Sequence, residues 1–151
     1  GKAEFYYKNF ILDNLEYPPF KKFWGIDIDL YDPGYKKYNH LDIKKRYDIV
    51  ICIDVLEHIP IEDIDYILNK LSSLSEKYIF LNVGCYSAAA LLPNGKNAHI
   101  NIQPPDWWYE QILKIIKIRE NLKIICNCTI EKDGKLKVFP LQFNDKINNY
   151  I

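Results

Sequence analysis

The chain has 151 residues, a length that suits one domain with a single hydrophobic core and is short for two. Its 48% hydrophobic and 15% aromatic content argue against disorder, and its 20 basic and 20 acidic side chains cancel, which disfavours binding to nucleic acid through phosphates. Since no apolar run approaches the roughly 20 residues that cross a bilayer and no charged-then-apolar leader is visible, we expect a soluble, cytoplasmic protein without a membrane partner.

The first half of the chain predicts a helix and two strands. Near-helical spacing of apolar side chains predicts a helix over residues 2–15, which Pro18 and Pro19 end. Residues 23–33 are rich in strand formers and predict a strand that ends near Asp32. Residues 47–54, YDIVICID, are an almost unbroken apolar run, typical of a strand buried on both faces of a parallel sheet.

The second half alternates between helical and extended patterns. Apolar residues on one stripe and acids at the start predict a helix over residues 61–77, and Asp106 can cap a second helix. The whole order favours an α/β fold, with a mostly parallel sheet and an antiparallel edge. The remaining expected elements are a strand at 78–86, a long loop at 87–105, a helix at 107–120, a strand at 123–131, a turn at Asp133-Gly134 and a strand at 135–143.

The four cysteines show no CxxC pairing, and three of them lie in apolar, strand-like runs. This pattern favours reduced thiols in the core over disulfides or zinc ligands, which agrees with a reducing compartment. The cysteines are Cys52, Cys85, Cys126 and Cys128.

Polar side chains follow the apolar runs, where an open α/β sheet binds its ligands. Asp32 closes the first strand-like run, where an acid can accept hydrogen bonds from the two hydroxyls of a ribose. The alternative is that Asp32 opens an Asp-Pro-Gly turn, and the spacing does not choose between the two. Asp54, Glu57 and His58 follow the second run, and Asn82 or Cys85 the third.

The segments LYDPGY, YDIVICIDVLEHIP and FLNVGCYSAAALLPNGKNAHINIQPPDWW resemble class I S-adenosylmethionine-dependent methyltransferases, and the resemblance covers nearly the whole chain. It implies one Rossmann-like domain over residues 1–151 with helices on both faces of the sheet. It also implies S-adenosyl-L-methionine across the strand ends, with Asp32 and Pro33 at the ribose and Ile53, Asp54 and Val55 lining the methionine side.

Family members open with a strand and a glycine-rich turn whose backbone approaches the cofactor closely. In this chain Gly1-Lys2-Ala3 resembles the last part of that turn, so Gly1 is expected at the cofactor. We therefore expect a fold that is truncated at its N-terminus and lacks its first strand. The exposed edge so created suggests a partner chain, which includes a homo-oligomer.

Asp54, Glu57 and His58 follow the pattern D-x-x-E-H, and His99 comes later, in NAHIN. Some small-RNA and quinone methyltransferases carry a similar run that binds magnesium, which would make these four residues the ligands of a divalent ion such as Mg²⁺. A second interpretation is metal-free catalysis, in which Glu57, His58 and His99 are catalytic and a histidine is the general base. A third is structural, with the acid and imidazole fixing the turn.

Two functions from different classes follow. The first is a methyltransferase-like protein that transfers a methyl group to an unidentified small or polymeric acceptor. The second is a non-catalytic remnant of the fold that serves as a binding or assembly module. Tyr86, Asn97, Trp107 and Trp108 either border the acceptor site or, for the two tryptophans, belong to the core.

Overall fold

The computed structural model describes residues 4–144, with side chains from residue 6 onward. Gly1, expected at the cofactor, lies outside the described residues. The chain divides into two compact units, of which the first ends at Ile43 and the second begins at Lys44. The single domain over 1–151 stays a prediction. No helix in the described range is long and apolar enough to cross a membrane.

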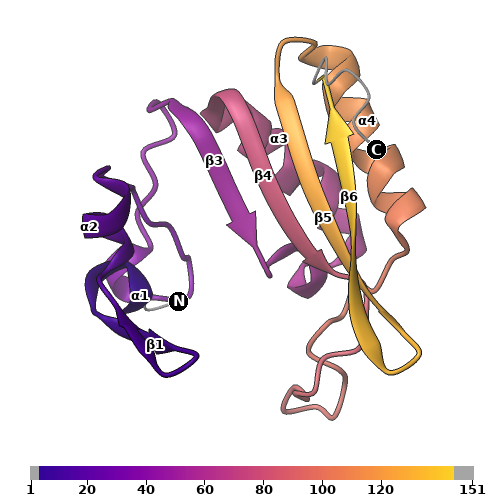
Figure 1. Cartoon of the computed structure of the whole chain (residues 1–151). Helices are drawn as coiled ribbons and strands as arrows, with labels where there is room; N and C mark the ends of the chain where they lie inside the picture. The colour runs from indigo at the N-terminus through magenta and orange to yellow at the C-terminus, as the bar shows by residue number, and fades with distance from the viewer. Residues whose placement is uncertain (1–3, 145–151) are drawn as a thin grey trace, which may run out of the picture. The chain divides into compact units, whose positions relative to one another are not determined.

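The first unit consists of short elements, shown in indigo and purple in Figure 1. Aromatic side chains link them: the rings of Phe10 and Tyr17 stack at 5.5 Å, and Phe20 contacts both Phe10 and Trp24. Its elements are α1 (Glu4–Tyr7), β1 (Phe10–Leu12), β2 (Leu15–Tyr17), α2 (Phe20–Trp24) and the short helix η1 (Lys36–Tyr38).

The prediction of a helix over residues 2–15 was wrong. Only Glu4–Tyr7 is helical, and β1 and β2 form an antiparallel hairpin. Asp13 and Asn14 take left-handed backbone conformations, with φ of 51° and 63°, which suit a two-residue hairpin turn. The spacing of the apolar residues resembles that of a helix, but the Asp13-Asn14 turn interrupts it and divides the segment into two strands.

The strand expected over residues 23–33 does not form either. Phe23 and Trp24 end α2, and Gly25 caps it with a left-handed φ of 65°. Ile26 and Ile28 bond to a side chain instead of a neighbouring strand. The hydroxyl of Tyr6 donates to the carbonyl oxygen of Ile26 at 2.9 Å and accepts from the N–H of Ile28 at 3.0 Å.

The second unit is built on a four-stranded sheet with the order β3-β4-β5-β6 (Figure 1). β3, β4 and β5 are parallel, and β6 pairs antiparallel with β5 across the Asp133-Gly134 turn. The strands, loop and terminal hairpin expected over residues 47–143 are therefore confirmed, with shifted ends. The strands are β3 (Tyr47–Ile53), β4 (Ser75–Gly84), β5 (Lys123–Lys132) and β6 (Lys135–Phe143).

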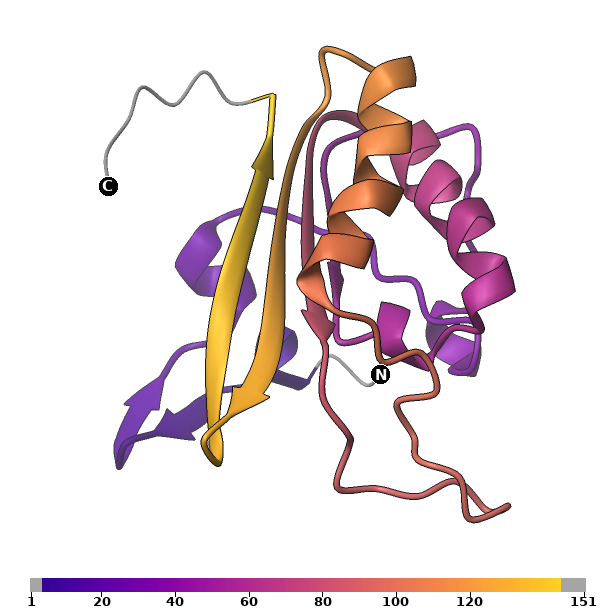
Figure 2. The same ribbon diagram turned by 90° about the vertical axis from the view of Figure 1, so that its right-hand side faces the viewer.

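Two helices cover one face of this sheet, α3 (Ile64–Leu74) and α4 (Pro105–Ile118), as Figure 2 shows. α3 is preceded by the short helices η2 (Leu56–His58) and η3 (Ile61–Asp63). Pro104, not Asp106, caps α4, so Asp106 lies in the first turn and makes no capping bond. The core between helices and sheet includes Leu68, Leu81, Ile112, Ile124 and the fully buried Trp108.

The opposite face of the sheet carries no helix of this unit, so the expectation of helices on both faces is not met within the described part of the second unit. β3 accordingly differs from the strand expected. Cys52 points toward the helices and is buried, whereas Ile51 on the other face is 55% exposed. A continuous apolar run has the same composition whether one or both faces are covered.

Candidate functional site

The candidate site lies where the parallel strands β3 and β4 end. Glu57 and His58 belong to η2, directly after β3, and His99 lies in the long loop between β4 and α4. The turn out of β3 is held by Asp54, whose backbone has a left-handed φ of 52° and whose N–H donates to the carbonyl oxygen of Asn82. Leu56, fully buried in the core, fixes the start of η2.

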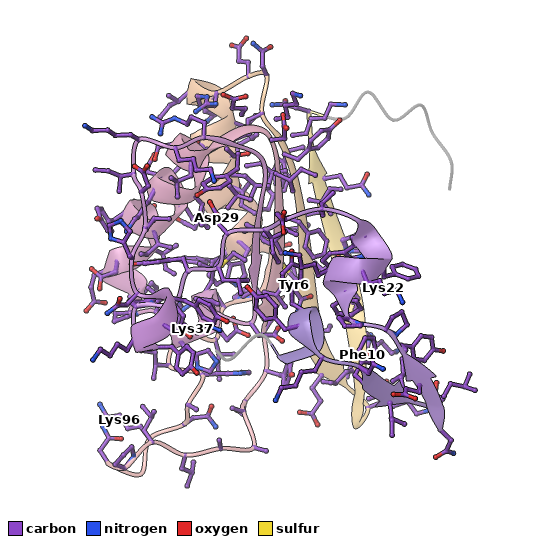
Figure 3. All side chains as sticks on the ribbon, turned by 90° about the vertical axis from the view of Figure 1, so that its left-hand side faces the viewer. Tyr6, Phe10, Lys22, Asp29, Lys37 and Lys96 are labelled. Atoms are coloured by element: carbon purple, nitrogen blue, oxygen red, sulfur yellow. The ribbon has the colours of Figure 1, made fainter. Side chains whose placement is uncertain are left out.

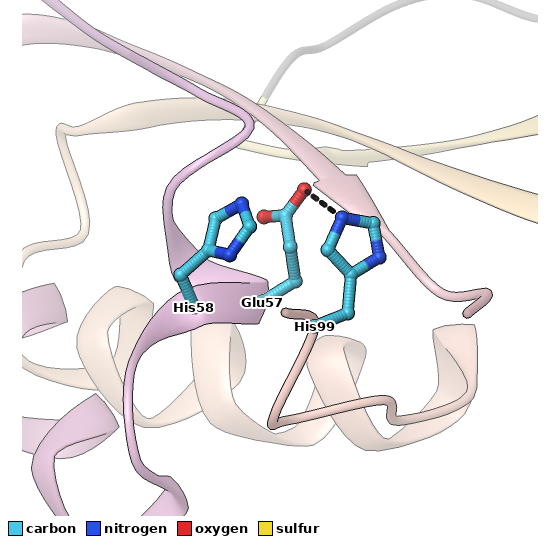
Figure 4. Close-up of side chains that lie close together, drawn as sticks. All are labelled: Glu57, His58 and His99. Atoms are coloured by element: carbon cyan, nitrogen blue, oxygen red, sulfur yellow. Dashed lines mark ion pairs between the residues drawn. The ribbon is translucent and has the colours of Figure 1, made fainter. Parts of the chain in front are cut away.

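Glu57, His58 and His99 converge at this edge of the sheet (Figure 4). Each offers one ligand atom, and these atoms lie within 4.8 Å of one another. The Nε2 atom of His99 lies 4.0 Å from Oε1 of Glu57, and the centroids of the two imidazole rings are 4.9 Å apart. We call these three residues the triad. Of the four residues expected to bind a metal, the structure brings three together.

Both histidines of the triad are oriented by backbone carbonyls. Nδ1 of His58 donates to the carbonyl oxygen of Ala98 at 2.8 Å, and Nδ1 of His99 donates to that of Tyr86 at 2.6 Å. Because a carbonyl only accepts, each Nδ1 is the donor in this bond, and Nε2 is the nitrogen directed at the site. Metal-binding histidines are typically held in this way, with the second ring nitrogen bonded to an acceptor.

Glu57 supplies a buried carboxyl group. Its side chain is 1% exposed, and Oε1 accepts a hydrogen bond from the N–H of Gly84 at 3.0 Å. Oε2 is buried and has no hydrogen-bond partner in the part of the chain that the structure describes. A buried carboxylate oxygen without a donor is costly, and a bound cation would remove that cost. This unpaired oxygen is the strongest sign that the triad takes a ligand.

The triad fits a divalent metal ion, with two imidazole nitrogens and one carboxylate oxygen as donors. Imidazole ligands suit Zn²⁺, Fe²⁺ and related ions, whereas Mg²⁺ prefers an all-oxygen set. Three protein ligands leave coordination positions for water or substrate. The donor set is therefore better matched to a transition-metal ion than to the Mg²⁺ expected from the resemblance.

Asp54, the fourth expected ligand, is not part of the triad. Its Oδ1 accepts a hydrogen bond from the side-chain amide of Asn82 at 2.7 Å. This pair joins the carboxyl ends of β3 and β4. Asp54 therefore acts in the described structure by fixing the turn that leads to η2, while its expected place at the cofactor stays a prediction.

The other residues expected at the cofactor divide between the two units. Ile53 and Val55 flank Asp54 and are 49% and 42% exposed, so their apolar side chains are accessible at the strand end. Asp32 and Pro33 belong to the first unit, where Oδ1 of Asp32 accepts a hydrogen bond from the N–H of Gly34 at 2.9 Å. The Asp-Pro-Gly turn is thus formed, and the ribose role of Asp32 stays a prediction.

The residues around the triad have different structural roles. The ring of Tyr86 lies 5.3 Å from that of His99, and the side chain of Asn97 bonds to Ala88 and to the N–H of His99, so it shapes the loop. Trp108 is fully buried, which confirms its place in the core. Trp107 packs against the same core.

Two residues beside the triad were not predicted from the sequence. A side chain on Gly84 would place its Cβ 2.9 Å from both Oε1 of Glu57 and Cε1 of His99, so only glycine leaves room there. Asn101 is 2% exposed, its N–H donates to the carbonyl oxygen of Glu57, and its side-chain amide has no partner among the described residues. The sequence holds one signal for each of them. Gly84 lies at the end of a strand, and Asn101 lies two residues after His99.

All four cysteines are free thiols, as expected, and three of them are buried. Burial, with the nearby charges of Glu57 and Asp54, raises the pKa of Cys52 to about 12. Hydrogen bonding to Cys126 raises the pKa of Cys128 to about 12. Hydrogen bonding to Cys128, together with burial, raises the pKa of Cys85 as well. These thiols are protonated and unreactive at neutral pH, which suits a role in packing.

No protein-family model, curated protein or solved structure matches the chain. The likeness to methyltransferases therefore depends on the quoted motifs alone.

Proposed function

We propose that the chain is a methyltransferase-like protein that uses S-adenosyl-L-methionine, and that the triad holds a divalent metal ion at the acceptor side of the site. The proposal combines two independent sources. The sequence motifs resemble those of the family, and the metal-binding arrangement comes from the geometry of Glu57, His58 and His99. The observation that carries the metal part of the proposal is the buried Oε2 of Glu57, unpaired within the described residues and close to two oriented imidazoles.

The location of the triad supports a ligand-binding role. In open α/β sheets, ligands bind beyond the carboxyl ends of the parallel strands, and the triad follows β3 and β4 at that edge. Exposed apolar groups, Ile53 and Val55, lie at the same strand end and are available to a cofactor. The proposed Rossmann-like arrangement is the finer form of the α/β fold described above.

The proposed reaction requires mainly that the protein position the two reactants. In methyl transfer the acceptor oxygen bonds to the methyl carbon as the carbon–sulfur bond of the sulfonium breaks, S-adenosyl-L-homocysteine leaves, and the proton of the acceptor passes to solvent. This in-line displacement depends mostly on positioning. A divalent ion, when bound, supplies Lewis-acid polarisation of an acceptor oxygen. Glu57, His58 and His99 then orient the acceptor, and the carbonyls of Ala98 and Tyr86 keep both Nε2 atoms directed at the site.

Calorimetric titration tests the two parts separately. S-adenosyl-L-methionine should bind the wild type, Asp32→Ala should weaken that binding, and Asp29→Ala, at an exposed aspartate of the first unit, is the control. Zn²⁺ and Mn²⁺ should bind more tightly than Mg²⁺. Glu57→Gln should lower Zn²⁺ affinity by more than about 100-fold, since it removes the only anionic ligand. His40→Ala, at an exposed histidine of the first unit, should not change it.

Absence of cofactor binding at millimolar ligand would refute the methyltransferase part of the proposal. Equal Zn²⁺ binding by wild type and Glu57→Gln would refute the metal part.

The second candidate, a non-catalytic binding or assembly module, is favoured by one observation on β3. This strand pairs only with β4 in the described structure, and its outer face exposes three isoleucines. Such an edge is a template for pairing with another chain. Self-association in sedimentation, abolished by Ile51→Lys and combined with no cofactor binding, would favour this candidate. The isoleucines are Ile49, Ile51 and Ile53.

A further inference from the structure

A hollow adjoins the triad on the side of the long loop. It has a volume of about 490 Å³, within the range of small-molecule sites, and it is open to solvent. His99 belongs both to this hollow and to the triad, so the hollow and the triad adjoin at this residue. The lining residues are Leu92, Asn94, Lys96, Asn97, His99 and Ile100.

The loop that forms the hollow has a defined shape. The N–H of Leu92 donates to the carbonyl oxygen of Lys96, and the N–H of Gly95 donates to that of Leu92, which closes a tight turn. The side chain of Asn97 accepts from the N–H groups of Ala88 and His99 and donates to the carbonyl oxygen of Ala88. These bonds fix the spacing between Lys96 and His99 before any ligand arrives.

The lining combines one cation with apolar surface. Lys96 carries the only fixed charge among the lining residues, and no carboxylate among the described side chains of residues 6–144 forms an ion pair with it. Leu92 and Ile100 expose aliphatic side chains in the same hollow. Figure 3 shows Lys96 at the tip of the loop, where its ammonium is accessible.

We propose that this hollow binds the methyl acceptor, and that the acceptor is a small organic acid with an apolar body. Its carboxylate pairs with Lys96, its apolar body covers Leu92 and Ile100, and its oxygen to be methylated lies toward His99. The proposal deepens the proposed function and rests on it, since the acceptor is defined by methyl transfer. It selects a small acid over a polyanion because a single lysine and a formal net charge of zero give no extended positive surface.

Two-dimensional amide NMR on the whole chain tests the proposal without metal or S-adenosyl-L-methionine. The probes are para-hydroxybenzoate and a hydroxylated hexanoate, each compared with its neutral amide. Both acids should shift the amide resonances of residues 92–100. Lys96→Gln should weaken that binding about tenfold, as expected for loss of one charge-assisted hydrogen bond, and Lys96→Arg should retain it.

Lys117→Gln, at an exposed lysine of α4, is the matched control and should bind the acids as the wild type does. The proposal is overturned if neither acid shifts residues 92–100, if the neutral amides bind as well as the acids, or if Lys96→Gln binds like the wild type. Its failure is distinct from failure of the proposed function, because cofactor and metal binding are measured separately and do not involve Lys96.

Discussion

Substitution of Gly84 by alanine tests the packing of the candidate site directly. The added Cβ would lie 2.9 Å from Oε1 of Glu57 and from Cε1 of His99, and 3.3 Å from Nδ1 of His99. Ordinary contacts between such atoms are about 3.5 Å or longer, so both side chains must move by several tenths of an ångström. Glu57 is 1% exposed and has little free space to move into.

The expected cost follows from two opposing terms. Overpacking in a close-packed interior costs about 1–3 kcal/mol, while replacing glycine by alanine at a compatible φ recovers about 0.4–1 kcal/mol through the unfolded chain. We expect a net loss of about 1–2 kcal/mol in the free energy of unfolding. With a urea m-value of roughly 2 kcal/mol/M, the unfolding midpoint should fall by about 0.5–1 M. Zn²⁺ affinity should fall by about 10–100-fold, because two ligands are displaced.

Urea unfolding followed by circular dichroism, together with Zn²⁺ calorimetry, measures both effects. Gly34→Ala is the control, since the nearest atom to its Cβ lies at an ordinary 3.4 Å, and its stability should stay within about 0.5 kcal/mol of the wild type. An unchanged unfolding midpoint for Gly84→Ala would show that the triad is not packed as described. A large stability loss with unchanged Zn²⁺ affinity would instead refute the assignment of Glu57 and His99 as ligands.

Three further predictions concern the core, the end of α3 and the thiol of Cys52. Leu81→Ala should cost about 2–5 kcal/mol and Ile51→Thr under about 1 kcal/mol in urea unfolding, because only Leu81 is buried; equal costs would contradict the one-sided burial of the sheet. Arg119→Met should cost about 1–3 kcal/mol, measured in the same way, because it removes the donors to the carbonyls of Ser72 and Ser75 at the end of α3. The pKa of Cys52 is raised from 9.0 to about 12 in the fold, so its thiol stabilises the folded state fully below pH 9 and loses that contribution as the pH rises toward 12. Cys52→Ala should therefore show a smaller loss of stability between pH 9 and pH 11 than the wild type, and an identical loss would refute the shift.

The candidate site could be predicted in part because its members stand near strand ends. Glu57 and His58 follow a recognisable apolar run, and His99 was linked to them through the resemblance. Asp54 could not be separated from the triad in advance, since its carboxylate is taken by Asn82, a residue 28 positions away. Gly84 was missed because its importance depends on two side chains that only the fold brings beside it.

The sequence by itself determined the strands, helices and hairpin of the second unit, because periodicity and turn residues act over a few neighbouring positions. In the first unit the same local patterns predicted a helix and a strand that do not form, since the Asp13-Asn14 turn and the Tyr6 hydroxyl decide the backbone there. Only the tertiary structure decided which face of β3 is covered and which side chains meet at its end. Burial and ligand geometry depend on groups far apart in the chain, and for that reason only the tertiary structure separated Glu57, His58 and His99, which come together, from Asp54, which does not join them.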